Sequence, residues 1–169
     1  MILPLKGKTP QIGEQTYVAP SADIIGDVTI GKNSSIWFHT TLRGDVMPIV
    51  IGSETNIQDN TVIHGTYKKC GAVIGNKVTV GHSVVLHGCK IGDLVLIGMG
   101  TIIMDQAEIP SRSIVAAGSL VTEDSKFPEG HLILGRPAKA VRPLNEKELA
   151  FLPKSAQNYM DYMEWYTKE

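Results

Sequence analysis

The 169-residue sequence has few of the features that mark secreted, membrane-spanning and nucleic-acid-binding proteins. It has only two cysteines, and its start, MILPLKGK, lacks the apolar core and small-residue cleavage site of a secretory signal. The longest nearly uncharged apolar run, Leu94 to Met104, falls well short of the roughly 20 residues that cross a bilayer. Acidic and basic residues are intermixed and give a formal net charge of -1, so no basic stripe is available for nucleic acid or an anionic membrane. We therefore expect a cytoplasmic protein with no nucleic-acid and no membrane partner.

An aliphatic residue recurs at every sixth position through most of the sequence. The series consists only of Val, Ile and Leu, and its members are Val18, Ile24, Ile30, Ile36, Leu42, Ile51, Ile57, Ile63, Ile74, Val80, Leu86, Ile91, Ile97, Ile103, Ile109, Val115 and Val121. Its spacing changes only after Leu42, Ile63 and Leu86, which indicates two loop insertions and one deletion. A helical period of 3.6 residues cannot produce a strict six, and an ordinary β-sandwich would not keep this register. The series predicts a parallel β-helix in which three hexads form one triangular coil.

A second series strengthens this prediction. Four residues after most of the aliphatics stands a small or β-branched residue, namely Ala22, Val28, Ser34, Thr40, Thr55, Thr61, Val78, Val84, Thr101, Ala107, Ser113 and Ser119. We expect this position to face inward beside a corner. Glycine often follows the aliphatic directly, as at Gly31 and Gly52, and suits a tight or left-handed corner.

The repeat stops after Val121, and a different pattern begins near residue 144. Asn145 followed three residues later by Glu148 is typical of a helix capping box. We predict residues 1–143 as the β-helix with an N-terminal lead-in, and residues 144–169 as a helix of roughly 20 residues that packs on it. We expect the helix to be interrupted or kinked at Pro153. The side chains expected to pack against the coil are Tyr159, Met160, Met163 and Trp165.

The register of the repeat brings two histidines together. Leu42, Ile63 and Leu86 fall on one face in consecutive coils, so the residues that follow them, Arg43, His64 and His87, form a column. Neighbouring strands are roughly 4.8 Å apart, and at that spacing two stacked imidazoles can share one ion.

A third histidine, His82, lies on the preceding face, above Asp59. A metal bound by His64 and His87 would be hard to reach for His82 of the same chain. In a trimer, however, three prisms packed around a three-fold axis bring one wall of each chain against a different wall of its neighbour. Three histidines with an open fourth position form a catalytic zinc site. A single surface histidine, such as His39 or His131, more often has no such role. The three together favour a metal site between subunits.

These residues and their neighbours resemble the gamma-class carbonic anhydrases across essentially the full length of the chain. The matching stretches are Arg43-Gly44-Asp45 before Met47-Pro48, Asn56-Ile57-Gln58-Asp59, His64, Gly81-His82 with His87-Gly88, and Leu134-Gly135-Arg136-Pro137-Ala138-Lys139. The resemblance implies a mainly β fold, a left-handed parallel β-helix of hexapeptide repeats with a C-terminal α-helix, assembled as a homotrimer.

The resemblance also implies a metal site and a reaction. Zn²⁺, with Fe²⁺ or Co²⁺ as alternatives, would be bound by His64 and His87 of one subunit and His82 of the next. The implied lyase reaction is the reversible hydration of carbon dioxide to bicarbonate by metal-bound hydroxide.

Further site residues follow from the same resemblance. Gln58 would orient the hydroxide, and Arg43 and Asp59 would form an ion pair between subunits. Asn56, Asp45 and Tyr159 would belong to the surroundings of the site.

The sequence departs from the best-known enzyme of this class at two positions. Val46 and Tyr67 stand where that enzyme looks to carry acidic residues, so we expect proton export to be slow, since general acid–base help contributes typically 10²–10⁴-fold. Two alternatives stay open: a metal-binding trimer with weak or different activity, and a hexapeptide acyltransferase that uses one histidine as a base. The fold alone cannot separate them.

Overall fold

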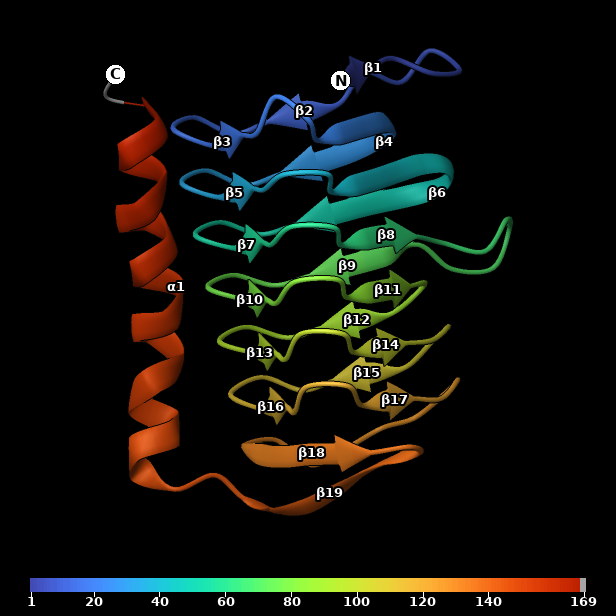
Figure 1. The fold of residues 1–169 in the computed structure, drawn as a ribbon. Coiled ribbons are helices and arrows are strands. Elements are labelled where there is room, and N and C mark those ends of the chain that lie inside the picture. Colours follow the sequence, from blue (N-terminus) through green and yellow to red (C-terminus); the bar gives the residue numbers. More distant parts are fainter. Residues whose placement is uncertain (168–169) are drawn as a thin grey trace.

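We describe residues 1–167 in a computed structural model of the protein. The chain winds into a stack of coils of short parallel strands, with one long helix along the side of the stack (Figure 1). The predicted hexapeptide-repeat parallel β-helix with a C-terminal α-helix is therefore confirmed. The described residues include no helix with the length and hydropathy of a membrane-spanning segment.

The strands form three faces of a prism. The histidine face contains β1 (Ile2–Leu3), the first parts of β4 (Asp23–Ile30) and β6 (Thr41–Ile51), β8 (Val62–His64), β11 (Val85–His87), β14 (Ile102–Ile103) and β17 (Leu120–Val121). The third face contains β2 (Gln11–Ile12), the later parts of β4 and β6, β9 (Ala72–Ile74), β12 (Lys90–Ile91) and β15 (Glu108–Ile109). The helix face contains β3 (Tyr17–Val18), β5 (Ser35–Ile36), β7 (Asn56–Ile57), β10 (Thr79–Val80), β13 (Leu96–Ile97), β16 (Ile114–Val115), β18 (His131–Gly135) and β19 (Ala138–Pro143).

The first predicted loop insertion is part of a strand instead. Residues 42–51 continue as β6, which bends around a corner together with β4 and joins the histidine face to the third face. Glycines permit this bend, because Gly26 has a φ of 73° and a Cβ at Gly44 would collide with the carbonyl oxygen of Asp27.

The two residue series form the interior as predicted. All the hexad aliphatics from Ile24 to Val121 are buried, Val18 is partly buried, and the small or β-branched series is buried throughout. Hydroxyls in the second series also join the coils: Ser34 donates to the carbonyl of Gly52 at 2.9 Å, and Thr55 donates to that of Gly75 at 2.8 Å. The corner serine or threonine thus binds a backbone oxygen of the next coil that would otherwise be unpaired.

The glycines that follow the aliphatics serve close approach, and the left-handed alternative is wrong for them. Gly31 and Gly52 do not have positive φ, but a Cβ at Gly52 would stand 2.5 Å from the carbonyl oxygen of Gly75. The left-handed corner positions are held by other residues, among them Asn33 and Glu54.

The C-terminal helix α1 (Glu146–Thr167) runs along the helix face, from the last coils toward the first (Figure 1). The capping box is confirmed: the backbone N–H groups of Asn145 and Glu148 each donate to the other residue's side chain at 2.9 Å. The division at residue 143 stays a prediction; β19 ends at Pro143, and residues 168–169 lie outside the described chain.

Two details of the helix prediction need correction. The helix continues through Pro153 without interruption, with Leu152, Ser155 and Ala156 buried around that residue, and a kink there stays a prediction. Trp165 does not pack against the coil: it is 67% exposed and its ring contacts Tyr162.

Candidate metal centre

His64 and His87 lie side by side at the end of the histidine face. They are paired residues of the neighbouring parallel strands β8 and β11, so their predicted stacking is confirmed. Nδ1 of His64 lies 3.2 Å from Nε2 of His87, and the two rings are tilted by 60°. The rigid strand register therefore brings one nitrogen of each ring to the same point.

Each of these histidines has a carboxylate on its other nitrogen. Nε2 of His64 lies 2.9 Å from Oδ1 of Asp45, and Nδ1 of His87 lies 2.6 Å from Oδ1 of Asp105. Arg43 in turn donates to Asp45 at 2.5 Å. This arrangement, with a carboxylate fixing the second nitrogen of a histidine, is typical of histidines that bind metal.

Both carboxylates are held ionised. Burial by itself would raise the pKa of Asp45, but hydrogen bonds from His64 and Arg43 outweigh burial and lower it. Burial likewise opposes ionisation of Asp105, but hydrogen bonds led by those from Thr66 and His87 lower its pKa to about 2. Ionised carboxylates only accept hydrogen bonds, so the histidine nitrogens that face them carry the protons.

When both rings are neutral, the facing nitrogens of His64 and His87 therefore point lone pairs at each other. Two lone pairs at 3.2 Å repel unless a proton or a cation lies between them. Two nitrogens each about 2.0–2.1 Å from a tetrahedral zinc ion are about 3.3–3.4 Å apart, close to the observed separation. The pair fits a metal as two of its ligands.

His82 and Asp59 form a second group on another edge of the prism. They lie at the corner between the helix face and the histidine face, where Nδ1 of His82 is 2.8 Å from Oδ2 of Asp59. The side chain of His82 is 46% exposed. The contact with Asp59 occupies Nδ1 of His82, so Nε2 is the nitrogen left to bind a metal.

A buried polar chain adjoins this second group and connects it to the helix. Gln58 donates to Asn56 at 3.1 Å, and Asn56 donates to the hydroxyl of Thr79 at 3.0 Å. Ser155 of α1 donates to the same hydroxyl at 2.9 Å. The side-chain amide of Gln58 is thus fixed through its nitrogen, and its carbonyl oxygen stays available as an acceptor.

Tyr159 lies beside Asp59 in an aromatic cavity of about 210 Å³. Its ring packs edge-on against Trp37 at 5.6 Å. The residues that line the cavity are Trp37, Phe38, Asp59, Tyr159, Tyr162, Trp165 and Tyr166. Burial and the nearby charge of Asp59 raise the pKa of Tyr159 to about 12, so the phenol keeps its proton at neutral pH.

The predicted site residues thus fall into two groups on separate edges. Arg43 and Asp45 accompany His64 and His87, whereas the other predicted residues, Asn56, Gln58, Asp59 and Tyr159, accompany His82. Within the described residues of one chain, no cluster of three or more histidine, cysteine, aspartate or glutamate side chains could hold a metal. The Arg43–Asp59 pair between subunits stays a prediction, since within one chain each binds a different partner.

Sequence reasoning missed three residues of this region: Asp105, Thr79 and Ser155. Asp105 could have been found, because it follows a hexad aliphatic by two positions in the coil next to His87, just as Asp59 does in the coil next to His82. Thr79 and Ser155 could not, because their contact depends on where the helix docks.

Comparison with known proteins places the chain among hexapeptide-repeat proteins. Residues 9–44 match the family described as "Bacterial transferase hexapeptide (six repeats)". The chain is 46% identical to a protein named carbonic anhydrase from Geobacillus kaustophilus, over 98% of this chain and 91% of that one. It is 44% identical to the mitochondrial gamma carbonic anhydrase 2 of Arabidopsis thaliana, over 96% of this chain. It spans about three fifths of the length of the two Arabidopsis relatives.

The fold is shared with solved structures. The crystal structure of a hexapeptide transferase family protein from Anaplasma phagocytophilum superposes with a TM-score of 0.94 at 46% identity, covering 98% of both chains.

Proposed function

This chain belongs to the hexapeptide-repeat family of the gamma carbonic anhydrases and their relatives, and from that premise we propose that it catalyses the reversible hydration of carbon dioxide to bicarbonate. The observation that carries the proposal is the 3.2 Å separation between Nδ1 of His64 and Nε2 of His87, on two rings whose other nitrogens each face a carboxylate. A general base needs only one histidine, so this arrangement favours metal binding over acyl transfer.

We propose that His82 of a neighbouring subunit completes the site. The two groups lie at opposite edges of the histidine face, and an apolar stripe lies between them. Its members are paired from strand to strand and point outward, namely Val62, Val85, Ile102 and Leu120. Val62 is 40% exposed in the single chain. Burying this stripe around a three-fold axis would bring one edge of each subunit against the other edge of its neighbour.

Each residue then has a role toward the substrate. His64, His87 and the partner subunit's His82 would hold a divalent metal, which supplies Lewis-acid activation of water at neutral pH. Asp45, Asp105 and Asp59 fix which nitrogen of each histidine is available. Gln58, held by Asn56, offers its carbonyl oxygen to orient the attacking water.

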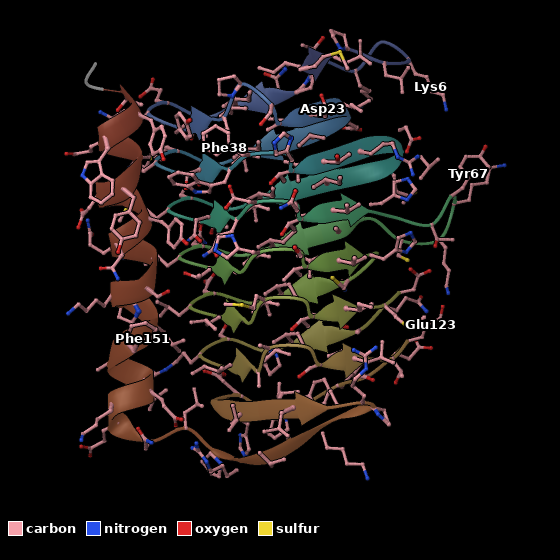
Figure 2. All side chains as sticks on the ribbon, viewed as in Figure 1. Lys6, Asp23, Phe38, Tyr67, Glu123 and Phe151 are labelled. Atoms are coloured by element: carbon pink, nitrogen blue, oxygen red, sulfur yellow. The ribbon has the colours of Figure 1, made fainter. Side chains whose placement is uncertain are left out.

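In the proposed reaction, the export of the proton released from water is the slow step. Val46 has no group that can carry a proton, and Tyr67 lies exposed at the tip of a loop on the side away from α1 (Figure 2). With no carboxylate at either position, protons leave without the help that general acid–base groups give. We therefore propose a hydration rate limited by proton transfer.

The sharing of the site is tested by complementation. His82→Ala and His87→Ala each destroy a different group, so homotrimers of either variant should lose metal. In trimers assembled from equal amounts of both, about one quarter of the interfaces combine two intact groups. We expect that fraction of wild-type zinc content and of stopped-flow hydration rate to return.

His39→Asn, at an exposed residue whose positive φ asparagine tolerates, should keep full metal content. No recovery in the mixed trimers, or full metal content in His82→Ala, would refute the shared site. Recovery of zinc without turnover would leave a metal-binding trimer and reject the hydratase.

A further inference from the structure

We propose that Asp105 is a positioning residue for His87, and that the loop at residues 65–71 controls the metal site through it. This inference rests on the proposed function, because it assigns a role around the same metal site. It concerns three residues that the sequence prediction did not include: Asp105, Thr66 and Lys69.

Asp105 joins the site to the loop through its two oxygens. It follows β14, in the coil next to β11, and its side chain is only 7% exposed. Oδ1 accepts a hydrogen bond from Nδ1 of His87 at 2.6 Å. Oδ2 accepts one from the hydroxyl of Thr66, also at 2.6 Å, and lies 3.4 Å from Nζ of Lys69. One carboxylate therefore fixes the imidazole on one side and the loop on the other.

The loop is built to hold these donors in place. Thr66 and Cys70 exchange backbone hydrogen bonds at 2.9 and 3.2 Å, which close the loop into a tight hairpin. Thr66 follows His64 by two residues, so its position is tied to the strand that carries the first histidine. Lys69 also lies 3.5 Å from Glu123, one coil beyond Asp105.

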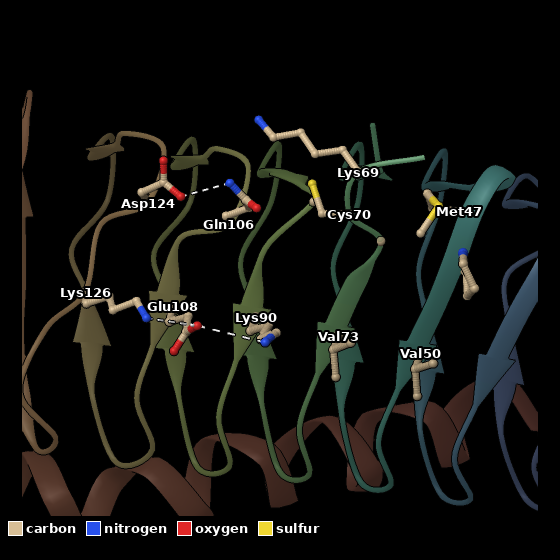
Figure 3. Close-up of a pocket in the computed structure, with 13 residues that line it drawn as sticks. Met47, Val50, Lys69, Cys70, Val73, Lys90, Gln106, Glu108, Asp124 and Lys126 are labelled. Atoms are coloured by element: carbon tan, nitrogen blue, oxygen red, sulfur yellow. Dashed lines mark hydrogen bonds and ion pairs between the residues drawn. The ribbon is translucent and has the colours of Figure 1, made fainter. Parts of the chain in front are cut away.

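The outer side of the same hairpin faces a groove of about 500 Å³ on the third face. Figure 3 shows Lys69 and Cys70 at one edge of this groove, near Gln106 and Asp124. Its polar groups are paired with one another: Lys126 lies 3.5 Å from Glu108, and Gln106 donates to Asp124 at 2.9 Å. The groove thus lies beside the hairpin, and the side-chain contact from the hairpin to His87 passes through Asp105.

The chemical consequence concerns the protonation pattern of His87. A carboxylate at Nδ1 keeps the proton on that nitrogen and leaves Nε2 unprotonated toward His64. Without Asp105, His87 could place its proton on Nε2, where it would donate to Nδ1 of His64 and block the metal position. Removing Asp105 should therefore lower the affinity for zinc by about 10–100-fold, as for other outer partners of metal-ligating histidines.

The test measures the tautomer of His87 and the affinity for zinc separately. In metal-free protein labelled with ¹⁵N-histidine, wild-type His87 should be protonated at Nδ1, and Asp105→Ala should move the proton to Nε2. Zinc affinity, measured by competition with a chelator, should fall by about 10–100-fold in Asp105→Ala. Thr66→Val removes one hydrogen bond to the Asp105 carboxylate, so it should lower the affinity less than Asp105→Ala does, and it should have no effect in the Asp105→Ala background.

Matched controls separate positioning from damage to the fold. Asp124→Asn, one coil further along, should leave both readouts unchanged, and Asp105→Asn, which keeps an acceptor oxygen, should retain the Nδ1 tautomer. Wild-type zinc affinity in Asp105→Ala, or an unchanged His87 tautomer, would overturn the inference. If the wild-type chain binds no zinc but Asp105→Ala still shifts the tautomer, the positioning role stands and the proposed function fails.

Discussion

The hydroxyl of Thr79 is the point where the helix and the candidate site are joined, so its removal should be costly. Thr79→Val preserves shape but removes the acceptor for both Ser155 and Asn56, and all three residues are buried. Asn56 keeps a long contact of 3.4 Å to the carbonyl of Val78, whereas Ser155 loses its partner. A buried donor left unpaired costs about 1–3 kcal/mol, so we expect the free energy of unfolding to fall by about 2 kcal/mol.

A double-mutant cycle tests this explanation. Adding Ser155→Ala removes the orphaned donor, so the double variant should recover about 1 kcal/mol relative to the sum of the single losses. Urea unfolding followed by circular dichroism, at one fixed protein concentration, measures each difference. Thr29→Val, on an exposed position of β4, is the matched control and should change stability by less than about 0.5 kcal/mol. Strictly additive losses would refute the reasoning, because two groups that share one buried bond cannot act independently.

Three other changes have expected outcomes. Leu86→Ala, at a fully buried residue directly before His87, should lower the free energy of unfolding by about 2–5 kcal/mol, whereas Leu86→Met should cost less than about 1.5 kcal/mol in the same urea assay. Glu148→Gln should destabilise the protein at neutral pH: Arg142 and the Asn145 cap lower the pKa of Glu148 from 4.5 to about 2, so its stabilisation is present above pH 4.5 and is lost as pH falls toward 2. Urea unfolding at several pH values should show wild type and variant converging in acid. Val46→Glu should raise the stopped-flow hydration rate if proton transfer limits it, and an unchanged rate would place the limit elsewhere.

The stacking of His64 on His87 could be predicted from the sequence, because the hexad repeat fixes which residues of neighbouring coils are paired. Once Ile63 and Leu86 are assigned to the same face, the following residues, His64 and His87, must be strand neighbours. The same counting placed His82 over Asp59, and the two side chains are 2.8 Å apart. A one-residue error would have turned every one of these side chains to the other side of its strand.

Counting hexads could not predict the contacts that depend on the shape of a loop or on the position of the helix. Thr66 reaches Asp105 only because a hairpin folds back, and nothing in the hexad spacing describes the shape of an inserted segment. The helix prediction selected large side chains: Tyr159 does pack against Trp37, whereas Trp165 does not, and the buried Leu152, Ser155 and Ala156 were missed. Small residues pack there because they let the helix approach the flat wall of the prism closely.

The division of the site between two edges follows from the fold itself. A triangular coil points the side chains of its walls away from one another, so residues on separate edges, such as His87 and His82, are directed outward and cannot converge within one chain. The interior, filled by the aliphatic column, has no room for a polar site. A β-helix that builds a metal centre of three histidines from two edges must therefore build it against another chain. This makes the apolar stripe through Val62 and Val85 as necessary to the proposed chemistry as the histidines beside it.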